Sequence, residues 1–384
     1  MLNDTVDLIR RKRKHESMSQ KSEQPRWIGG VEPSKKLLAM NGTQILEYEC
    51  REQPTKLREL IAAYKQNEEI RKELCAVSGA AAGSSAPVIF IGMGGSLCAS
   101  ISASIHLQSN ARLAFSVDAG EWLHYARPVW KDAAVSILVT ASGESAELVE
   151  FMKQDLGGPV ALICNNSASP CWQHAKHRLP ILAGPEYGNA TKTYTNSTAA
   201  GIILASEMLG LEWKVNADHV ANVMANSIDK LFAVRGRMEE FCRGAANLEI
   251  IGRGAAYGAA YMGALTIREM SGFRAAAHTG GGFKHGPNLD TNNTHVAMIF
   301  AVGRAAALGM KLAAECNRKG GRVLLVSNDE VKPTDLMLPV QIDAVPEPWE
   351  GITTLVVPQA LTLVWIERNG CNLPPRFAYG VMEQ

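Results

Sequence analysis

The sequence lacks the features that mark membrane, disulfide-rich and metal-binding proteins. No apolar run in its 384 residues approaches the ~18 residues that a membrane-spanning helix needs. The opening stretch, MLNDTVDLIRRKRKHESMSQ, has no apolar segment of the kind found in secretory signals. Its eight cysteines are scattered, without a CxxC pair or a Cys/His cluster, which predicts reduced thiols and a cytoplasmic location. A net charge of +1 gives no general reason to expect nucleic acid or a membrane as partner.

Several catalytic signatures are missing as well. The sequence has no Gly-x-Ser-x-Gly elbow, no phosphate-binding P-loop, no HExxH motif and no carboxylates at metal-binding spacing. We therefore expect neither a metal nor a cofactor, and general acid–base chemistry remains. The composition, 46% hydrophobic and 20% charged, is that of a globular enzyme long enough for two domains.

Short apolar runs alternate with helix-length segments along most of the chain. Four such runs, VIFI, VSILV, GPVALIC and LPILAG, are followed in the second half by NLEIIG, HVAMIFAV, GRVLLVSND and LMLPVQID. This alternation predicts α/β domains, each a doubly wound parallel sheet flanked by helices, and its repetition predicts an internal duplication.

The expected segments follow from these runs. Residues 10–24 are polar and basic, and we interpret them as part of a solvated arm rather than a nucleic-acid contact, the alternative. The stretch EYECREQPTKLRELI predicts a helix that has Pro54 in its first turn, after a break. The predicted divisions are a mobile arm and lead-in at 1–44, a helix at 45–74, a first domain at 75–210, a helical linker at 211–234, a second domain at 235–370 and an irregular tail at 371–384.

Two glycine- and hydroxyl-rich stretches follow strands of the first domain. GMGGS comprises residues 92–96, and TASGES comprises residues 140–145. Backbone N–H groups at such turns, together with serine and threonine hydroxyls and the positive end of the next helix, suit an anion. GMGGS alone is equally compatible with a tight turn that binds no ligand, and TASGES alone would favour a helix N-cap. Two of them at the strand ends of one sheet favour a ligand.

The run REMSGFRAAAHTGGGFKHGPNLD, residues 268–290, contains a second candidate site. Glu269 closes a helical pattern, and His285 follows it by sixteen residues, after three consecutive glycines. A glutamate on a helix is usually solvated, and a histidine is usually structural. The glycines make a functional role more plausible for both residues, because we expect them to form a flexible hinge where backbone passes close to a ligand.

These motifs resemble the sugar isomerase (SIS) domain family, in particular the tandem-SIS isomerase module of glucosamine-6-phosphate synthase. The resemblance extends from about residue 45 to 384. It rests on EYECREQP, VIFIGMGGS, VTASGES and GPEYGNATKTYT, and most specifically on GRGAAYGAAYMGALTIREMSGFRAAAH followed by GGGFKHGP.

The resemblance implies roles for individual residues. Glu269 would move a proton between C1 and C2 of a sugar, and His285 would open the sugar ring. In the family this histidine reaches the site of the neighbouring subunit, so a homodimer is implied. The residues implied to hold the 6-phosphate or line the sugar are Gly94, Gly95, Ser96, Thr140, Ser142, Ser145, Asn189 and Thr191.

The sequence departs from the synthase pattern at four points. No glutaminase domain accompanies the SIS region in this sequence, so glutamine is not the expected nitrogen donor. Thr266 stands where the family has a lysine, Gly282 replaces a loop glutamate, and the tail RFAYGV has no lysine for a Schiff base. The expected function is therefore isomerisation, deamination or deglycation of a hexose 6-phosphate, in particular an amino sugar or a glycated amine. The alternatives are a sugar with a sulfonate at the same position and a non-catalytic phosphosugar sensor.

Overall fold

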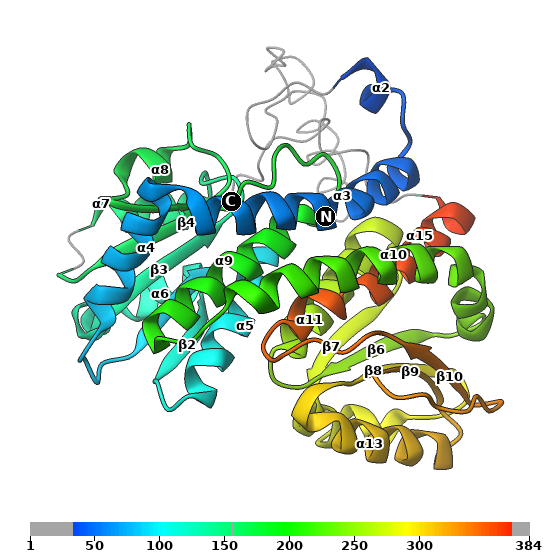
Figure 1. The fold of residues 1–384 in the computed structure, drawn as a ribbon. Coiled ribbons are helices and arrows are strands. Elements are labelled where there is room, and N and C mark those ends of the chain that lie inside the picture. Colours follow the sequence, from blue (N-terminus) through cyan, green and yellow to red (C-terminus); the bar gives the residue numbers. More distant parts are fainter. Residues whose placement is uncertain (1–33, 155–156, 371–384) are drawn as a thin grey trace, which may run out of the picture.

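The computed structural model describes residues 34–154 and 157–370 (Figure 1). Most of the predicted N-terminal arm and the whole tail at 371–384 lie outside these residues. Two five-stranded sheets, entirely parallel, dominate the described part, with strand orders β2-β1-β3-β4-β5 and β7-β6-β8-β9-β10. The strands are β1 (Val88–Gly92), β2 (Ala114–Asp118), β3 (Val135–Thr140), β4 (Val160–Cys164), β5 (His177–Pro180), β6 (Asn247–Gly252), β7 (Ala275–Thr279), β8 (His295–Ala301), β9 (Arg322–Ser327) and β10 (Met337–Gln341). The predicted fold class, two parallel α/β units in tandem, is confirmed.

Helices precede, connect and cover the strands of the first sheet. They are α2 (Lys35–Leu38), α3 (Gly42–Gln66), α4 (Glu68–Ala81), α5 (Gly95–Ser109), α6 (Ala119–Tyr125), η2 (Arg127–Asp132), α7 (Ala146–Lys153), α8 (Pro170–His174) and α9 (Lys192–Leu209). The long helix α10 (Lys214–Cys242) then leads to the second sheet. The helices of that half are α11 (Ala256–Ser271), α12 (Gly280–Lys284), η3 (Pro287–Asp290), η4 (Gly303–Ala305), α13 (Ala306–Arg318), α14 (Glu350–Thr353) and α15 (Val356–Asn369).

The sequence analysis missed two strands, β2 and β7, which occupy equivalent edges of the two sheets. Each pairs with a single neighbour, β1 or β6, and each is fully buried only at its first residue. Central strands such as β1 and β3 are buried along their whole length and therefore consist of continuous apolar residues. Edge strands with one exposed face do not need such a run, so AFSVD and AAAHT gave no signal.

The helical stretch before the first sheet differs from the prediction. Pro54 lies well inside α3, so its expected place in a first turn is wrong. Because proline has no N–H, the Cys50 carbonyl four residues earlier loses its helical partner. The Gln53 side chain supplies a replacement, since its Nε2 donates to the Cys50 carbonyl at 3.1 Å. The stretch at 45–74 is also two helices, because Asn67 ends α3 and caps α4.

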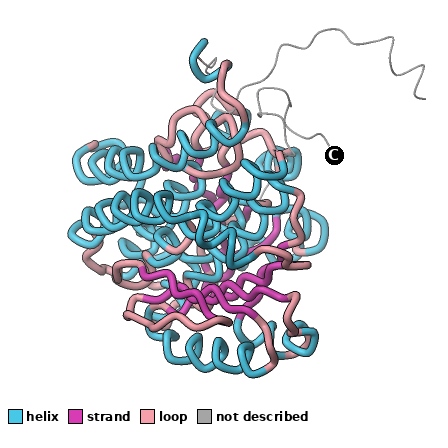
Figure 2. The backbone as a smooth tube through the Cα atoms, turned by 90° about the vertical axis from the view of Figure 1, so that its right-hand side faces the viewer, coloured by secondary structure: helices cyan, strands magenta, loops and turns pink. Residues whose placement is uncertain are grey.

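Helices between the two sheets join the two halves. Helix α5 packs against α9 and α11, and α3 packs against α9, α10 and α15 (Figure 1). One continuous apolar core runs through these helices and the inner faces of both sheets. Smaller cores lie on the outer faces, under α6 to α8 in the first half and under α13 in the second. Figure 2 shows the strands enclosed by helices in this way. Because α11 packs on α5, the second half reaches the strand ends of the first.

No helix within the described ranges is both long enough and apolar enough to cross a membrane.

Candidate functional site

The turn after β1 presents backbone N–H groups at the start of α5. Gly94 adopts a φ of +51°, a conformation that residues with side chains rarely occupy. The helix begins at Gly95, and no side chain caps it at Gly94. The N–H groups of Ser96 and Leu97 donate to the Met93 carbonyl, at 3.0 and 3.4 Å, so the amides left for a ligand within the described chain are those of Gly94 and Gly95. Ser96 adds a hydroxyl in the first turn. These groups, with the positive end of a fifteen-residue helix, can bind an anion.

The turn after β3 adds three hydroxyl groups. The Thr140 Oγ1 accepts a hydrogen bond from the Gly143 N–H at 3.0 Å, and the Ser142 Oγ accepts one from the Glu144 N–H at 3.2 Å. Each hydroxyl keeps its own proton for donation. Ser145 precedes α7, and its side chain makes no capping bond. The loop therefore has donors available for a ligand.

Gly143 is needed at this point for two reasons. Its φ is +68°, and an added Cβ would lie 2.1 Å from the Ser169 Oγ.

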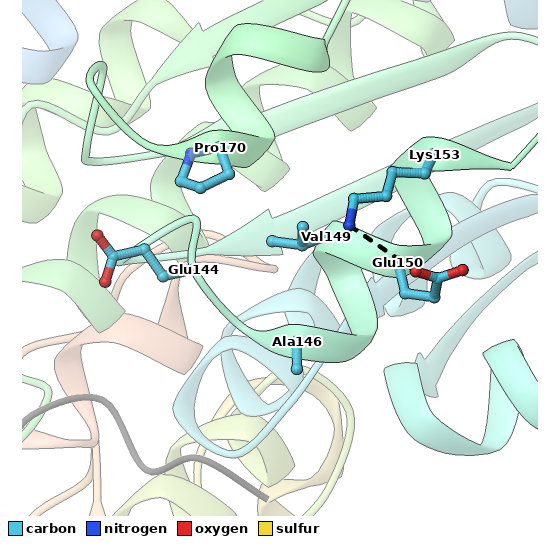
Figure 3. Close-up of a pocket in the computed structure, with 6 residues that line it drawn as sticks. All are labelled: Glu144, Ala146, Val149, Glu150, Lys153 and Pro170. Carbon is cyan, nitrogen blue, oxygen red and sulfur yellow. Dashed lines mark ion pairs between the residues drawn. The ribbon is translucent and has the colours of Figure 1, made fainter.

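The next residue, Glu144, lines a separate hollow of about 510 Å³ beside α7 (Figure 3). In this hollow the Lys153 Nζ lies 4.0 Å from the Glu150 Oε2. The hydroxyls of the loop and the Glu144 carboxylate therefore border different spaces.

A cavity of about 390 Å³ lies between these two loops and α11. It brings together seven of the ten predicted site residues, including Glu269 from the second half of the chain. Glu269 is the one charged side chain in its described lining. The lining residues are Met93, Gly94, Gly95, Ser96, Thr140, Ala141, Ser142, Ser145, Ala190, Thr193, Tyr194, Ser197, Met262, Leu265 and Glu269.

Asn189, predicted to line the sugar, contacts Glu269 directly. Its Nδ2 donates to the Glu269 Oε2, and its Oδ1 accepts a hydrogen bond from the Thr266 Oγ1 at 2.9 Å. Asn189 and Thr266 are each 1% exposed. The carboxylate at the cavity wall is thus held by a buried, uncharged pair from two different elements.

Thr191, the other residue expected beside the sugar, is committed elsewhere. It is fully buried, and its N–H and hydroxyl both donate to the Glu186 Oε1, at 2.9 and 2.8 Å. Thr193 donates to the same carboxylate through its N–H, at 3.2 Å, and through its hydroxyl. Glu186 thus fastens the loop that carries Asn189 to the start of α9, and Thr191 does not line the cavity.

A second buried carboxylate holds the same loop from α3. Glu49 accepts hydrogen bonds from the N–H groups of Tyr187 and Gly188. Burial, and then the nearby Glu186, raise the pKa of Glu49 to about 8. Lys192, 2% exposed, donates to the Glu52 Oε2 at 2.6 Å and so supplies a compensating charge. The motifs EYECREQP and GPEYGNATK, on which the family resemblance partly rests, supply the two sides of these contacts.

The wall formed by α9 was missed by the sequence analysis. Thr193 and Tyr194 line the cavity, and Ser197 lines it one helical turn later. The Ser197 side chain is 4% exposed, and its hydroxyl makes no hydrogen bond within the described part of the chain. In the sequence, KTYTNST looks like the polar face of a helix, so nothing there distinguished a ligand contact.

His285 lies apart from the cavity. It caps the C-terminal end of α12 and is exposed to solvent. The glycines before it are not the flexible hinge that we expected, because they form the first turn of α12, capped by the Thr279 hydroxyl. A Cβ added to Gly280 would lie 2.2 Å from the Arg253 guanidinium, so a larger residue there would displace that side chain. Within one chain, the structure therefore does not bring His285 to Glu269.

A search of residues 34–154 and 157–370 for three or more His, Cys, Asp or Glu side chains placed to hold a metal found none. The chemistry that the cavity offers is anion binding at one end and proton transfer by a carboxylate at the other.

Comparison with known families gives two matches to the SIS domain, at residues 84–206 and 243–365. A glutamine–fructose-6-phosphate aminotransferase (isomerizing) of Zymomonas mobilis is 26% identical over 63% of this chain and 42% of its own. The enzyme of the same name from Bacillus cereus is 28% identical over 68% of this chain and 45% of its own. The chain thus spans less than half of the length of these curated relatives.

Solved structures share the fold at low sequence identity. The C-terminal domain of glucosamine-fructose-6-phosphate aminotransferase from Francisella tularensis superposes with a TM-score of 0.76 at 18% identity, covering 89% of this chain and 99% of that one. Tagatose-6-phosphate ketose/aldose isomerase from Escherichia coli gives 0.70 at 16%, covering 92% and 99%. Glucosamine-6-phosphate deaminase from Thermotoga maritima gives 0.62 at 17%, covering 80% and 99%. At these identities the likeness shows the fold alone.

Proposed function

The chain belongs to the SIS domain family, and from that premise we propose that it is a phosphosugar isomerase or deaminase. Its substrate is a hexose 6-phosphate, in particular an amino sugar or a glycated amine. The observation that carries the proposal is the cavity itself. Two loops of anion-binding type from the first domain and Glu269 from the second line the same space of about 390 Å³.

The loops after β1 and β3 are proposed to bind the 6-phosphate. Ser96, Ser142 and Ser145 each have a hydroxyl proton to donate, and α5 and α7 both begin beside them. Binding energy at the phosphate orients the reacting carbons, which do not themselves touch these loops. Ser197 is proposed to lie along the sugar, whereas Asn189, which is 1% exposed and outside the described lining, is proposed to act through Glu269.

Glu269 is proposed to transfer a proton between C1 and C2 of the open-chain sugar. Its carboxylate takes the C2 hydrogen as a proton, the C–H electrons form the C1–C2 double bond, and O1 gains a proton, giving an enediol. Return of the proton to C1, with loss of the proton on O2, gives the ketose. A positioned base of this kind contributes ~10²–10⁴-fold.

The same shift serves substrates that bear nitrogen. With an amino group at C2, protonation at C1 leaves an imine at C2, water adds to it, and ammonia departs. With an amine at C1, the reverse shift leaves an imine at C1, and its hydrolysis releases the amine and an aldose. These steps need only acid–base groups, so the proposed reaction draws on no cofactor.

His285 is proposed to open the sugar ring in the active site of a second subunit. Its exposed position outside the cavity of its own chain is compatible with that arrangement, and Leu289 nearby is an apolar side chain 80% exposed. Mixing the variants E269Q and H285A tests the shared site. In a mixed dimer one site keeps both native residues, so random pairing restores about a quarter of wild-type activity. If each histidine serves its own subunit, every site in the mixture lacks one residue and no activity returns.

We propose a cytoplasmic location on the state of the thiols. The seven described cysteines are free, and six of them are buried, as expected in a reducing compartment. No nucleic-acid or membrane partner is proposed.

A substrate panel tests the proposed function. Glucosamine, galactosamine and fructosamine 6-phosphates, hexose 6-phosphates and a sulfosugar are incubated with the protein, and ammonia, free amine and ketose are assayed separately. The matched control is each sugar without its anionic group. Turnover of a 6-phosphate, but not of its unphosphorylated control, is the expected result. Tight binding of a sugar without turnover would indicate a sensor. Turnover of the sulfosugar alone would mean that the substrate has a sulfonate in place of the phosphate. Either result overturns the proposal.

A further inference from the structure

Two buried side chains behind the cavity form a chain of hydrogen bonds that ends on Glu269. Thr266 lies one turn before Glu269 on α11, and Asn189 belongs to the loop between β5 and α9. The Thr266 hydroxyl donates to the Asn189 Oδ1 at 2.9 Å, and the Asn189 amide donates to the Glu269 Oε2. We propose that Thr266 and Asn189 are a positioning pair that holds Glu269 ionised and correctly oriented. This inference rests on the proposed function and deepens it.

The hydrogen bonds from Thr266 to Glu269 run in one direction in the structure. An asparagine side chain has a donor end and an acceptor end, and a half-turn of the amide exchanges them. With the Thr266 proton directed at Oδ1, Nδ2 must face Glu269. An amide N–H favours the charged form of a carboxylate, whereas a neutral carboxyl group would need an acceptor there. In this orientation, Thr266 and Asn189 together favour the ionised base.

The pair is also rigidly held, because the Asn189 loop has little freedom. Glu186 and Glu49 accept hydrogen bonds from backbone N–H groups on both sides of Asn189. Asn189 belongs to the first domain and Thr266 to the second. The orientation of the Glu269 carboxylate thus depends on how the two domains pack against each other. The contact lies on the side of the first domain where the loops after β1 and β3 border the cavity.

The titratable neighbours of Glu269 on the surrounding helices are neutral groups. The described lining of the cavity has no charged side chain except Glu269. Cys98 on α5 and Tyr194 on α9 are titratable neighbours on the helices packed around it. Burial raises the pKa of Cys98 to about 12 and that of Tyr194 above its ordinary value, so both are neutral where a carboxylate titrates. Neither group therefore adds a charge beside Glu269, and the hydrogen bond from Asn189 favours the ionised form.

Thr266→Val is the decisive variant, because valine keeps the volume and removes only the hydroxyl. We expect kcat to fall about tenfold with little change in KM, since the carboxylate loses its fixed orientation and not its substrate contacts. The acid limb of the pH–rate profile should move upwards by about half a pH unit. Thr266→Ser should restore both. Thr353→Val is the matched control, because Thr353 is also fully buried but its hydroxyl has no hydrogen-bond partner among the described residues.

A measurement without turnover separates this inference from the proposed function. In protein labelled with 13C at glutamate side-chain carboxyls, the signal of Glu269 is the one missing from Glu269→Gln. Its titration midpoint should rise in Thr266→Val and return in Thr266→Ser, whether or not any sugar is converted. An unchanged midpoint in Thr266→Val overturns the positioning pair even if the protein is an active isomerase. A shifted midpoint in a protein that converts no sugar supports the pair and rejects the proposed function.

Discussion

The two domains have the same strand order but different side chains at their strand ends. The first turn of each has a glycine at positive φ, Gly94 at +51° and Gly254 at +56°. The second turn repeats this feature, with Gly143 at +68° and Gly303 at +58°. The backbone path is therefore common to both domains. The hydroxyls of GMGGS and TASGES are replaced in the second domain by GRGAA and AVGRAA, which have none.

In the second domain, the carboxylate of Glu347 lies against the loop after β8. Glu347 accepts a hydrogen bond from the Arg304 N–H at 2.8 Å and another from the Arg304 Nε at 2.6 Å. A Cβ added to Gly303 would lie 3.0 Å from the Glu347 Oε1. The Glu347 side chain thus lies beside the loop after β8. The corresponding loop of the first domain, after β3, borders the cavity instead. The duplication preserved the fold, and under the proposed function it places the anion-binding loops in one domain and the proton-transfer carboxylate in the other.

The largest effect is expected from removing the contribution of the second domain. Glu269→Gln should lower kcat by ~10²–10⁴-fold, because the amide keeps the shape of the side chain but cannot take a proton. Substrate binding, measured by calorimetry, should change little. Glu150→Gln, which alters an exposed glutamate on α7, is the control and should remain fully active. A fully active Glu269→Gln protein would show that the base lies elsewhere.

The proposed anion-binding role of the first domain is tested by removing its serine hydroxyls. Ser142→Ala and Ser145→Ala should each raise KM about 10- to 100-fold, because each removes a hydrogen bond to a charged group. The matched control is Ala305→Ser, which introduces a hydroxyl at the equivalent position before α13 in the second domain. It should leave KM unchanged. A change in KM for Ala305→Ser, or none for both serine variants, would remove the proposed division between the domains.

The sequence revealed the parts of the site that are contiguous in the chain. GMGGS and TASGES were found because their glycines and hydroxyls stand together, directly after buried strands. The contact between Asn189 and Thr266 joins residues 77 apart, and neither residue has a local signal. Ser197 looks like any polar residue on a helix, and β2 and β7 lack apolar runs because only the first residue of each is fully buried. Side chains that become functional only through packing therefore escaped the sequence analysis.

Buried carboxylates in the two domains predict different pH dependences of stability. Burial, with Glu186 nearby, raises the pKa of Glu49 from 4.5 to about 8, and burial raises that of Glu350 from 4.5 to about 7. The folded state then keeps these protons longer than the unfolded chain, so stability falls as pH rises from about 4.5 through the folded pKa of each group. A tenfold difference in proton affinity between the folded and unfolded states corresponds to about 1.4 kcal/mol.

Urea unfolding across this pH range measures the effect. Glu350→Gln should flatten the decline up to about pH 7, and Glu49→Gln should flatten it up to about pH 8. Both variants keep an acceptor oxygen, so for Glu49 the hydrogen bonds from Tyr187 and Gly188 can persist. Slopes equal to that of the wild type in both variants would mean that these carboxyl groups are ionised in the folded protein throughout.

The smallest effect is expected at Glu347, whose carboxylate lies beside the loop of the second domain. Burial alone would raise its pKa, but hydrogen bonds from the Arg304 side chain and N–H lower it below the ordinary value. Because the Arg304 side chain is 70% exposed, Glu347→Gln should cost no more than about 1 kcal/mol of stability, and less in high salt. KM should stay at the wild-type value, since the Glu347 carboxylate does not line the cavity. A rise in KM would instead mean that the loop of the second domain takes part in substrate binding, and that the duplication left two working anion sites.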